Sequence, residues 1–241
     1  MTDQISRAFP RRRDTKMDVE VISFVAYVTQ PPWSPPDRRA IAFIRAAKGQ
    51  PASPDNSRLH AVVNQHAFGW FGKMAAVVLE MKRLDPPITL IPMPNSDCYI
   101  GSGEGPRTTA LANAITKHLR NATVVDAMRW RACQTPAHEG GARDPEALYR
   151  ALVLLLPIPE KGTLIIVDDV LTTGAHALAA AAKVSTERNP CRLAICLGRT
   201  VWQQHDRSFF IFRTKLTHAC WQRPPRPPLH YSLDLTSPPA R

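Results

Sequence analysis

Short apolar segments of strand length alternate with helical segments in the middle of this 241-residue chain, and this alternation restricts the fold more than any other feature. Hydrophobic side chains at consecutive positions predict strands that are buried on both faces. Such strands, separated by helices, are typical of a Rossmann-like parallel sheet with helices on both faces, so we expect an α/β fold. The predicted strands are Ile88–Met93, Ala122–Val125, Leu164–Val167 and Arg192–Leu197, and the helices among them include Thr108–Leu119 and Ala175–Lys183.

The residues on either side of this core predict an N-terminal extension and a tail. One strand, Val19–Thr29, and two helices, Asp37–Lys48 and His60–Leu84, are expected to pack on the core, with Asp37 as the N-cap of the first helix. The four predicted regions are a mobile basic leader (1–18), the N-terminal strand and helices (19–86), the core (87–215) and a tail rich in proline and arginine (216–241).

The net charge of +11 lies mainly at the two ends of the chain. Residues 1–50 and 201–241 each carry a net charge of +4, whereas the residues between them carry only +3. We expect a long polyanion such as nucleic acid to meet these basic ends. The near-neutral centre is then left for different chemistry.

Cysteine usage and hydropathy indicate the compartment. The five cysteines show no C-x-x-C spacing, and their odd number argues against a secreted disulfide framework. No stretch approaches the ~20 apolar residues of a membrane-spanning helix. We therefore expect a cytoplasmic protein that does not associate with membranes.

The segment 163–175, TLIIVDDVLTTGA, carries the clearest chemistry. An apolar strand leads to two carboxylates, Asp168 and Asp169, and then to a Thr-Thr-Gly turn (172–174) at the start of a helix. The N–H groups of such a turn and of the helix N-terminus attract phosphate. Gly174 permits a backbone conformation that other residues resist. Because the carboxylates accept hydrogen bonds, they suit a ribose diol beside the phosphate, and the segment predicts a sugar-phosphate site.

This segment resembles the phosphoribosyl-pyrophosphate (PRPP) signature of the type I phosphoribosyltransferases, in which an apolar strand, an acidic pair, a threonine-rich turn and glycine follow in the same order. The resemblance implies the type I phosphoribosyltransferase fold, with Asp168 and Asp169 as the catalytic pair. The residues it implies for binding the ribose and the 5-phosphate are Asp168, Asp169, Leu171, Thr172, Thr173, Gly174 and Ala175.

Other segments are similar to the ComF-type competence-protein family. The proline-containing turn that follows the strand at 88–93 resembles that family's pyrophosphate-binding loop, and residues 41–49 resemble the helix before its core. The residues implied in pyrophosphate binding, partly through backbone N–H groups, are Pro94, Asn95, Ser96 and the later Arg107. The chain lacks the paired C-x-x-C zinc knuckles with which the family usually opens.

The segment 131–145 resembles an arginine-rich flexible segment of the same family. The resemblance implies a lid that closes over the ligand and excludes water. Its implied lid residues are Arg131, His138 and Arg143.

The activity implied by the resemblance is transfer of phosphoribose from PRPP to a nitrogenous acceptor. Mg²⁺ is the implied cofactor, held largely by the substrate near Asp168 and Asp169 rather than by protein ligands alone. Thr172 stands where enzymes of this superfamily that act on 6-oxopurines tend to carry an aspartate, so hypoxanthine and guanine are not expected acceptors. The alternative hypothesis is a non-catalytic PRPP sensor or an accessory protein of DNA uptake or processing, whose basic ends bind nucleic acid or a DNA-processing protein.

Overall fold

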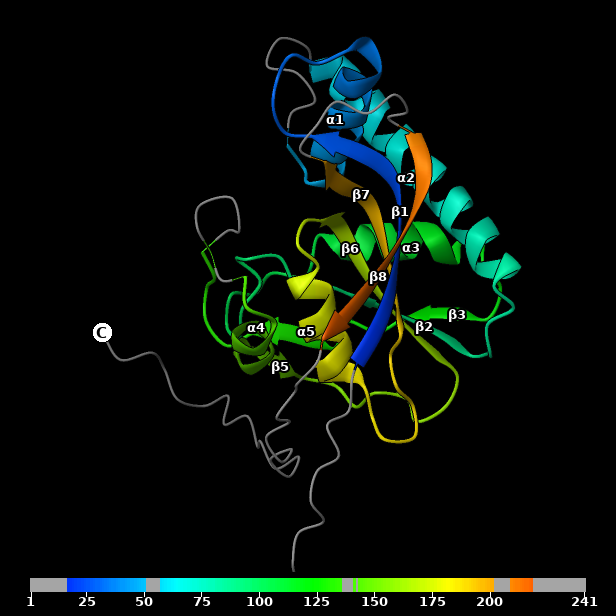
Figure 1. Ribbon diagram of the computed structural model, residues 1–241, viewed down its shortest axis with the longest axis vertical. Helices are drawn as coiled ribbons and strands as arrows, with labels where there is room; N and C mark the ends of the chain where they lie inside the picture. Colours follow the sequence, from blue (N-terminus) through cyan, green and yellow to red (C-terminus); the bar gives the residue numbers. More distant parts are fainter. Residues whose placement is uncertain (1–16, 51–56, 136–140, 142, 202–208, 219–241) are drawn as a thin grey trace, which may run out of the picture.

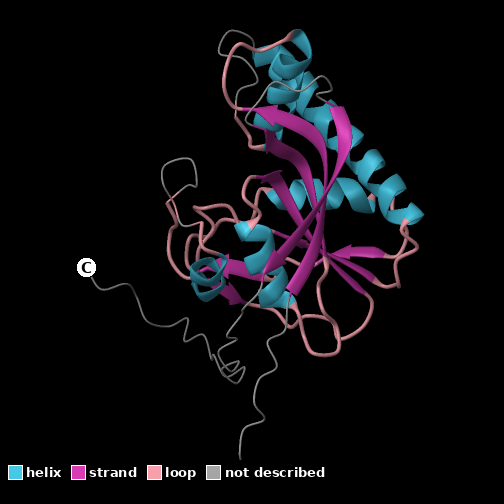
Figure 2. Cartoon of the chain, in the orientation of Figure 1, coloured by secondary structure: helices cyan, strands magenta, loops and turns pink. Residues whose placement is uncertain are grey.

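A six-stranded sheet organises the computed structural model (Figures 1 and 2). The structure describes residues 17–50, 57–135, 141, 143–201 and 209–218, with only the backbone at residues 57–65, 209, 210 and 218. The helices are α1 (Pro35–Ala47), α2 (Ser57–Met81), α3 (Thr108–Thr116), α4 (Pro145–Ala151) and α5 (Ala175–Val184). The strands are β1 (Met17–Val28), β2 (Ile88–Pro92), β3 (Ala122–Val124), β4 (Met128–Trp130), β5 (Leu152–Leu154), β6 (Thr163–Leu171), β7 (Leu193–Val201) and β8 (Phe209–His218).

The strand order in the main sheet is β3-β2-β6-β7-β1-β8. The first five strands of this order run parallel, and β8 lies antiparallel beside β1. The four strands expected in the core, now β2, β3, β6 and β7, are all present. The prediction of an α/β fold with a mostly parallel sheet is therefore confirmed, and the architecture is compatible with a Rossmann-like fold.

The N-terminal strand was expected to pack on the core, but the structure makes it part of the central sheet. β1 is hydrogen-bonded on both sides, to β7 and to β8. Nearly all of its residues from Val19 to Val28 are buried, so the strand needs a neighbour along each edge and cover on each face. β8 continues to His218, so the first residues assigned to the tail are a strand of the same sheet.

Two hydrophobic layers cover the sheet. α1, α2 and α3 pack on one face, where their apolar residues meet those of β1, β2, β6 and β7. α4 and α5, with the small antiparallel pair β4–β5, pack on the other face. Figure 1 shows the second group gathered on the opposite side of the sheet from α1 and α2. No helix among the described residues has both the length and the apolar character needed to cross a bilayer.

Some boundaries differ from those expected, for local reasons. α1 is capped by Ser34 rather than Asp37: the Asp37 N–H donates to Ser34 Oγ, and the Asp37 carboxylate accepts from the Ser34 N–H at 2.9 Å. Asp37 is thus the third residue of a capping box. The pair β4–β5 was not expected, because its three-residue strands are too short to display an alternating pattern.

Two glycines of α2 give a test of how closely α2 packs on α3. A Cβ at Gly72 would lie 2.2 Å from the Ala114 carbonyl oxygen, whereas a Cβ at Gly69 would meet nothing within 4 Å. We expect Gly72→Ala to lower the free energy of unfolding by about 1–3 kcal/mol, because backbone must move. The matched change Gly69→Ala should raise it by about 0.5–1 kcal/mol. Urea unfolding of both variants measures the difference, and equal effects would contradict the packing described.

Candidate functional site

The order of the strands reverses between β2 and β6. The chain passes from β2 through α3 to β3 on one side, and from β6 through α5 to β7 on the other. β2 and β6 are paired along their whole common length, with Pro92 opposite Val167, and the Met93 N–H donates to the Val167 carbonyl at 2.8 Å. In open α/β sheets, ligands bind beyond the carboxyl ends of the strands at such a switch point. The two loops singled out in the sequence both begin here.

The first loop is the turn between β6 and α5. The strand was expected to end at Val167, but β6 continues to Leu171. The acidic pair therefore lies within the strand, near its carboxyl end. Thr172 and Thr173 follow it and are exposed. Their N–H groups, and that of Gly174, have no acceptor within the part of the chain that the structure describes. Three unpaired donors at the start of a helix suit an anion.

Gly174 is required at this turn for two reasons. Its φ of 87° lies in the left-handed region, and it is the N-cap of α5. A Cβ would also lie 2.6 Å from a methyl carbon of Leu216 in β8. The turn therefore packs directly against the last strand of the sheet. The Ala175 N–H, next in the chain, bonds weakly to Thr173 Oγ1 at 3.4 Å.

The acidic pair is partly enclosed by protein. Burial of the carboxyl group, together with repulsion by the charge of Asp169, raises the pKa of Asp168 to about 8. The Asp169 N–H, which donates to Asp168 Oδ1 at 2.8 Å, and the charge of Lys48 act in the opposite direction. One proton is therefore held at Asp168 near neutral pH. Although Asp168 retains intermediate exposure, its carboxyl group is surrounded closely enough for desolvation to dominate.

The second loop follows β2, and only some of its polar groups are hydrogen-bonded within the protein. Pro94 has no N–H to offer, and its carbonyl accepts from Trp130 Nε1 at 3.1 Å, which corrects the expectation of N–H donors at all three loop positions. Asn95 Oδ1 accepts from the Arg107 N–H at 2.9 Å. The N–H groups of Asn95 and Ser96 have no acceptor among the described residues. Two backbone donors thus remain for a ligand beside β2.

Arg107 holds this loop to its neighbours. Its guanidinium group donates to the Lys48 carbonyl at 3.3 Å and lies 3.8 Å from the Asp97 carboxylate. The next residue, Thr108, donates from Oγ1 to the Met93 carbonyl at 2.7 Å. The start of α3 is therefore fastened to the end of β2. The charge of Arg107 is near the second loop, as expected, but Asp97 partly neutralises it.

Two aromatic side chains link the two loops, and sequence reasoning did not single them out for the site. Trp130 is buried, bonds to Pro94 through its indole N–H, and packs edge-to-face on His176 with ring centroids 5.9 Å apart. His176 lies in the first turn of α5, where burial lowers the pKa of its imidazole and the charge of Asp169 opposes that effect. A tryptophan in a three-residue strand and a histidine in a helix carry no sequence signal of this contact.

Lys48 and Cys196 are two further neighbours of the acidic pair. Lys48 is the C-cap of α1. Cys196 lies on β7 opposite Asp168, and burial together with the two nearby carboxyl groups raises the pKa of its thiol well above the usual value. The thiol therefore stays protonated and inert. Neither residue carries a sequence signal of a site, since each reaches the pair from another element.

The residues expected in a lid fall into three situations. Arg131 is exposed directly after β4, and its N–H is bonded to the Ala151 carbonyl at 2.8 Å. Arg143 is exposed on the segment that leads into α4, and it is not without an interaction partner. His138 lies outside the described residues. The Gln134 N–H donates to the Ser96 carbonyl at 2.9 Å, so the start of this segment borders the second loop.

Metal ligands of the protein alone do not gather at this site. Within the described residues no three side chains of histidine, cysteine, aspartate or glutamate are grouped so as to hold an ion. Asp168 and Asp169 offer carboxylate oxygens, the ligands that Mg²⁺ prefers, but they leave most of an octahedral shell to other groups. This donor set fits Mg²⁺ only when a ligand supplies further oxygens.

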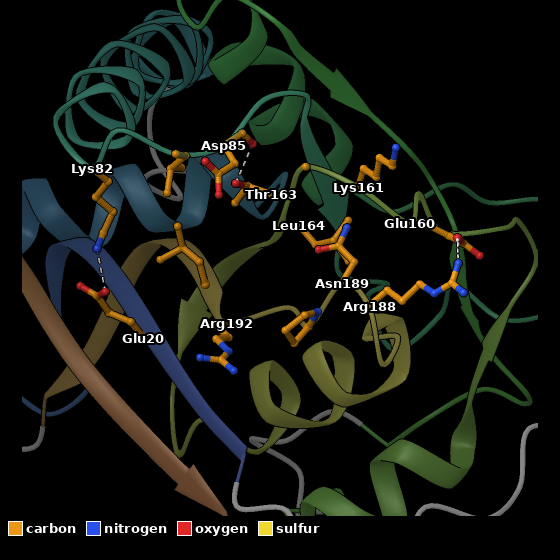
Figure 3. Close-up of a pocket in the computed structure, with 14 residues that line it drawn as sticks. Glu20, Lys82, Asp85, Glu160, Lys161, Thr163, Leu164, Arg188, Asn189 and Arg192 are labelled. Carbon is orange, nitrogen blue, oxygen red and sulfur yellow. Dashed lines mark hydrogen bonds and ion pairs between the residues drawn. The ribbon is translucent and has the colours of Figure 1, made fainter.

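A hollow of about 560 Å³ lies at the opposite edge of the sheet, where β6 and β7 begin (Figure 3). None of the expected site residues lines it. Its charges are largely paired: Lys82 with Glu20 at 2.7 Å, and Arg188 with Glu160 at 3.4 Å. Thr163 Oγ1 donates to the Asp85 carbonyl. Because cations and carboxylates are interleaved here, the hollow does not favour an anionic ligand, and the switch point remains the candidate site.

No protein-family model and no curated protein matches this chain. The candidate site therefore stands on its own geometry.

The raised pKa of Asp168 predicts a pH-dependent stability. In the unfolded chain Asp168 loses its proton near the ordinary pKa of 3.8, whereas in the folded protein it keeps the proton up to a pH of about 8. Between these two values the folded state binds more protons than the unfolded state, so the free energy of unfolding falls as pH rises. We expect Asp168→Asn, which keeps the acceptor for the Asp169 N–H, to raise the free energy of unfolding at pH 8 by about 1–3 kcal/mol and to flatten the profile.

Urea unfolding from pH 4 to pH 9 measures this effect. Glu80→Gln, at an exposed position on α2, is the matched control and should retain the wild-type profile. A wild-type stability that is constant or increases from pH 5 to pH 8, with no gain from Asp168→Asn, would show that Asp168 is an ordinary carboxylate.

Proposed function

We propose that this protein binds PRPP, or a related 5-phosphoribosyl compound, at the switch point and transfers its phosphoribosyl group to a nitrogenous acceptor. One observation carries the proposal: the two loops expected to bind the two phosphate-bearing ends of PRPP follow adjacent parallel strands, β2 and β6. Residues about 75 positions apart in the chain are thereby brought to one edge of the sheet, on either side of the strand-order reversal.

The turn after β6 is the proposed 5-phosphate site. The unpaired N–H groups of Thr172, Thr173 and Gly174, and the N-terminus of α5, all favour a dianion. The exposed threonine hydroxyls add donors. The left-handed φ of Gly174 gives the turn a backbone conformation that other residues resist.

The acidic pair is proposed to accept hydrogen bonds from the ribose diol. Asp168 and Asp169 precede the turn by a few residues, so they lie beside the phosphate rather than facing it. A diol donates two hydrogen bonds, and the carboxyl oxygens of the pair accept them. Mg²⁺, held jointly by the carboxylates, the diol and the pyrophosphate, would supply positive charge to the leaving group.

The second loop is proposed to receive the pyrophosphate. The N–H groups of Asn95 and Ser96 point to this role, and the charge of Arg107 is close by. In the transfer, the bond from C1 of the ribose to the pyrophosphate oxygen breaks and a bond from C1 to the acceptor nitrogen forms. Pyrophosphate leaves with the bonding electrons, and the acceptor loses its proton to solvent. The protein's share is orientation and charge stabilisation.

The finer classification is part of the same proposal. The order of strand, acidic pair, turn and helix at 163–175 supports a type I phosphoribosyltransferase fold, with the ComF-type family as the nearest resemblance. The strand β4 and the helix α4 flank the segment 131–145, where the resemblance implies a lid. The sequence departs from that family's usual opening in lacking the paired C-x-x-C motifs.

Isothermal titration with PRPP and Mg²⁺ tests the binding site. We expect measurable binding by the wild type and a loss of at least ~100-fold in Asp168→Asn/Asp169→Asn, because both carboxyl groups that would accept from the diol and help to hold Mg²⁺ are removed. Asp85→Asn/Glu160→Gln removes two carboxylates at the opposite edge of the sheet and is the matched control. Undiminished binding by the first double variant would show that the site lies elsewhere.

A screen of nitrogenous bases for pyrophosphate release separates enzyme from sensor. Release with one base, dependent on Asp168 and Asp169, supports transfer, whereas tight PRPP binding without release supports the sensor hypothesis. Thr172 has no carboxylate to serve as a base near a purine, so hypoxanthine and guanine should give no product. Conversion of either base to its nucleotide would contradict the interpretation that Thr172 excludes these purines as acceptors.

A further inference from the structure

We infer that Trp130 is a positioning residue, which aims the backbone N–H groups of the loop after β2 at the pyrophosphate end of the ligand. The inference rests on the proposed function and adds a residue from outside both loops. Trp130 is only 1% exposed, so it acts through the loop rather than by touching a ligand. The N–H groups of Asn95 and Ser96, which have no acceptor among the described residues, belong to two consecutive peptide groups. Each of these peptide groups is held by its carbonyl oxygen.

The first peptide group is held directly by the Trp130 side chain. Its indole N–H donates to the Pro94 carbonyl at 3.1 Å, and this bond is buried. The peptide bond from Pro94 to Asn95 is trans, so its carbonyl and its N–H point in opposite directions within one plane. A carbonyl that is fixed toward the indole therefore turns the Asn95 N–H away from it. A buried carbonyl that lost its donor would be costly, so this orientation is strongly favoured.

The second peptide group is held by the Trp130 main chain, through Cys98. The Asn95 carbonyl accepts from the Cys98 N–H at 2.9 Å, which turns the Ser96 N–H away from Cys98 in the same manner. The Cys98 carbonyl in turn accepts from the Trp130 N–H at 3.1 Å, and the Ile100 N–H donates to the Trp130 carbonyl at 2.9 Å. One residue of β4 thus fixes both peptide groups whose donors are proposed to bind the pyrophosphate.

Trp130 is itself fixed relative to the turn after β6. It pairs with Leu152 of β5 and lies in the same hydrophobic layer as Ala175, the first residue of α5. Its indole packs edge-to-face on His176, with ring centroids 5.9 Å apart. Because α5 begins directly after the turn at 172–174, the side chain that orients the second loop also lies against the helix that follows the first. Trp130 therefore sets the second loop relative to the proposed 5-phosphate site.

Titrations of Trp130→Phe with three probes in the presence of Mg²⁺ test the inference. The variant keeps an aromatic ring and the main-chain bonds but loses the indole N–H. We expect binding of inorganic pyrophosphate and of PRPP to weaken by about 5- to 10-fold, because the Asn95 N–H is no longer held in one direction. Binding of ribose 5-phosphate should change less than about 2-fold, because its phosphate would lie in the turn at 172–174.

Two further proteins separate orientation of the loop from a general loss of packing. Trp70→Phe is the matched control, since Trp70 also makes edge-to-face ring contacts but lies on α2, on the opposite face of the sheet. It should bind all three probes like the wild type. Benzothienylalanine at position 130 has the shape of tryptophan with sulfur in place of the N–H. It should reproduce the selective loss, also where Trp130→Phe fails to fold.

Amide NMR during the pyrophosphate titration gives a second readout. In the wild type, the signals of the Asn95 and Ser96 N–H groups should both shift as pyrophosphate is added. In Trp130→Phe, the shift of Asn95 should shrink more than that of Ser96, because the indole N–H holds only the first peptide group. Equal responses of Asn95 in the two proteins would overturn the assignment.

The outcomes separate this inference from the proposed function. If the wild type binds neither PRPP nor ribose 5-phosphate, the proposed function fails, and the role of Trp130 fails with it. If the wild type binds them, and the protein without the indole N–H binds all three probes equally well or loses all three to the same degree, only the positioning role is overturned. A loss confined to pyrophosphate and PRPP supports it.

Discussion

The parallel pairing of β2 with β6 is the constraint on which the rest of the site depends. Its register sets Pro92 opposite Val167, so the loop after β2 begins beside the carboxyl-terminal part of β6. Both loops therefore lie at the same edge of the sheet. Alternate residues of β6 pack in different hydrophobic layers, so a shift of one residue would exchange the side chains that fill each layer. The packing of the two layers therefore also fixes the distance between the two loops.

The acidic pair shows the tension between stability and function at this edge. A carboxyl group at Asp168 loses water on folding and lies beside a second carboxyl group, which favours a bound proton. An apolar residue there would avoid this cost but would offer nothing to a ribose diol. Destabilised polar groups of this kind gather at functional sites. Lys48, arriving from α1, offsets part of the repulsion, so the helix contributes to the electrostatics of a pair that lies about 120 residues later.

Much of the fold could be predicted from sequence because the parallel strands are continuous apolar segments and Gly174 and its neighbours have strong local preferences. The prediction was less accurate where local signals were short or ambiguous. The apolar segment before Asp168 was expected to stop at the first charge, yet β6 continues to Leu171 because β7 pairs with it beyond that point. Asn95 was expected to serve a ligand through its backbone N–H, and the bond that its side-chain Oδ1 accepts from the Arg107 N–H was not predicted.

The sequence by itself determined the chemistry of the turn at 172–175: the hydroxyls, the glycine and the preceding carboxylates are consecutive, so their proximity requires no tertiary structure. Only the tertiary structure decided which other groups surround them. Lys48, Trp130 and His176 come from three different elements, and their contacts depend on the close approach of α1 at Gly198 and on the packing of α5. Contacts between distant segments arise from the burial of complementary surfaces, and a single sequence does not display which surfaces will meet.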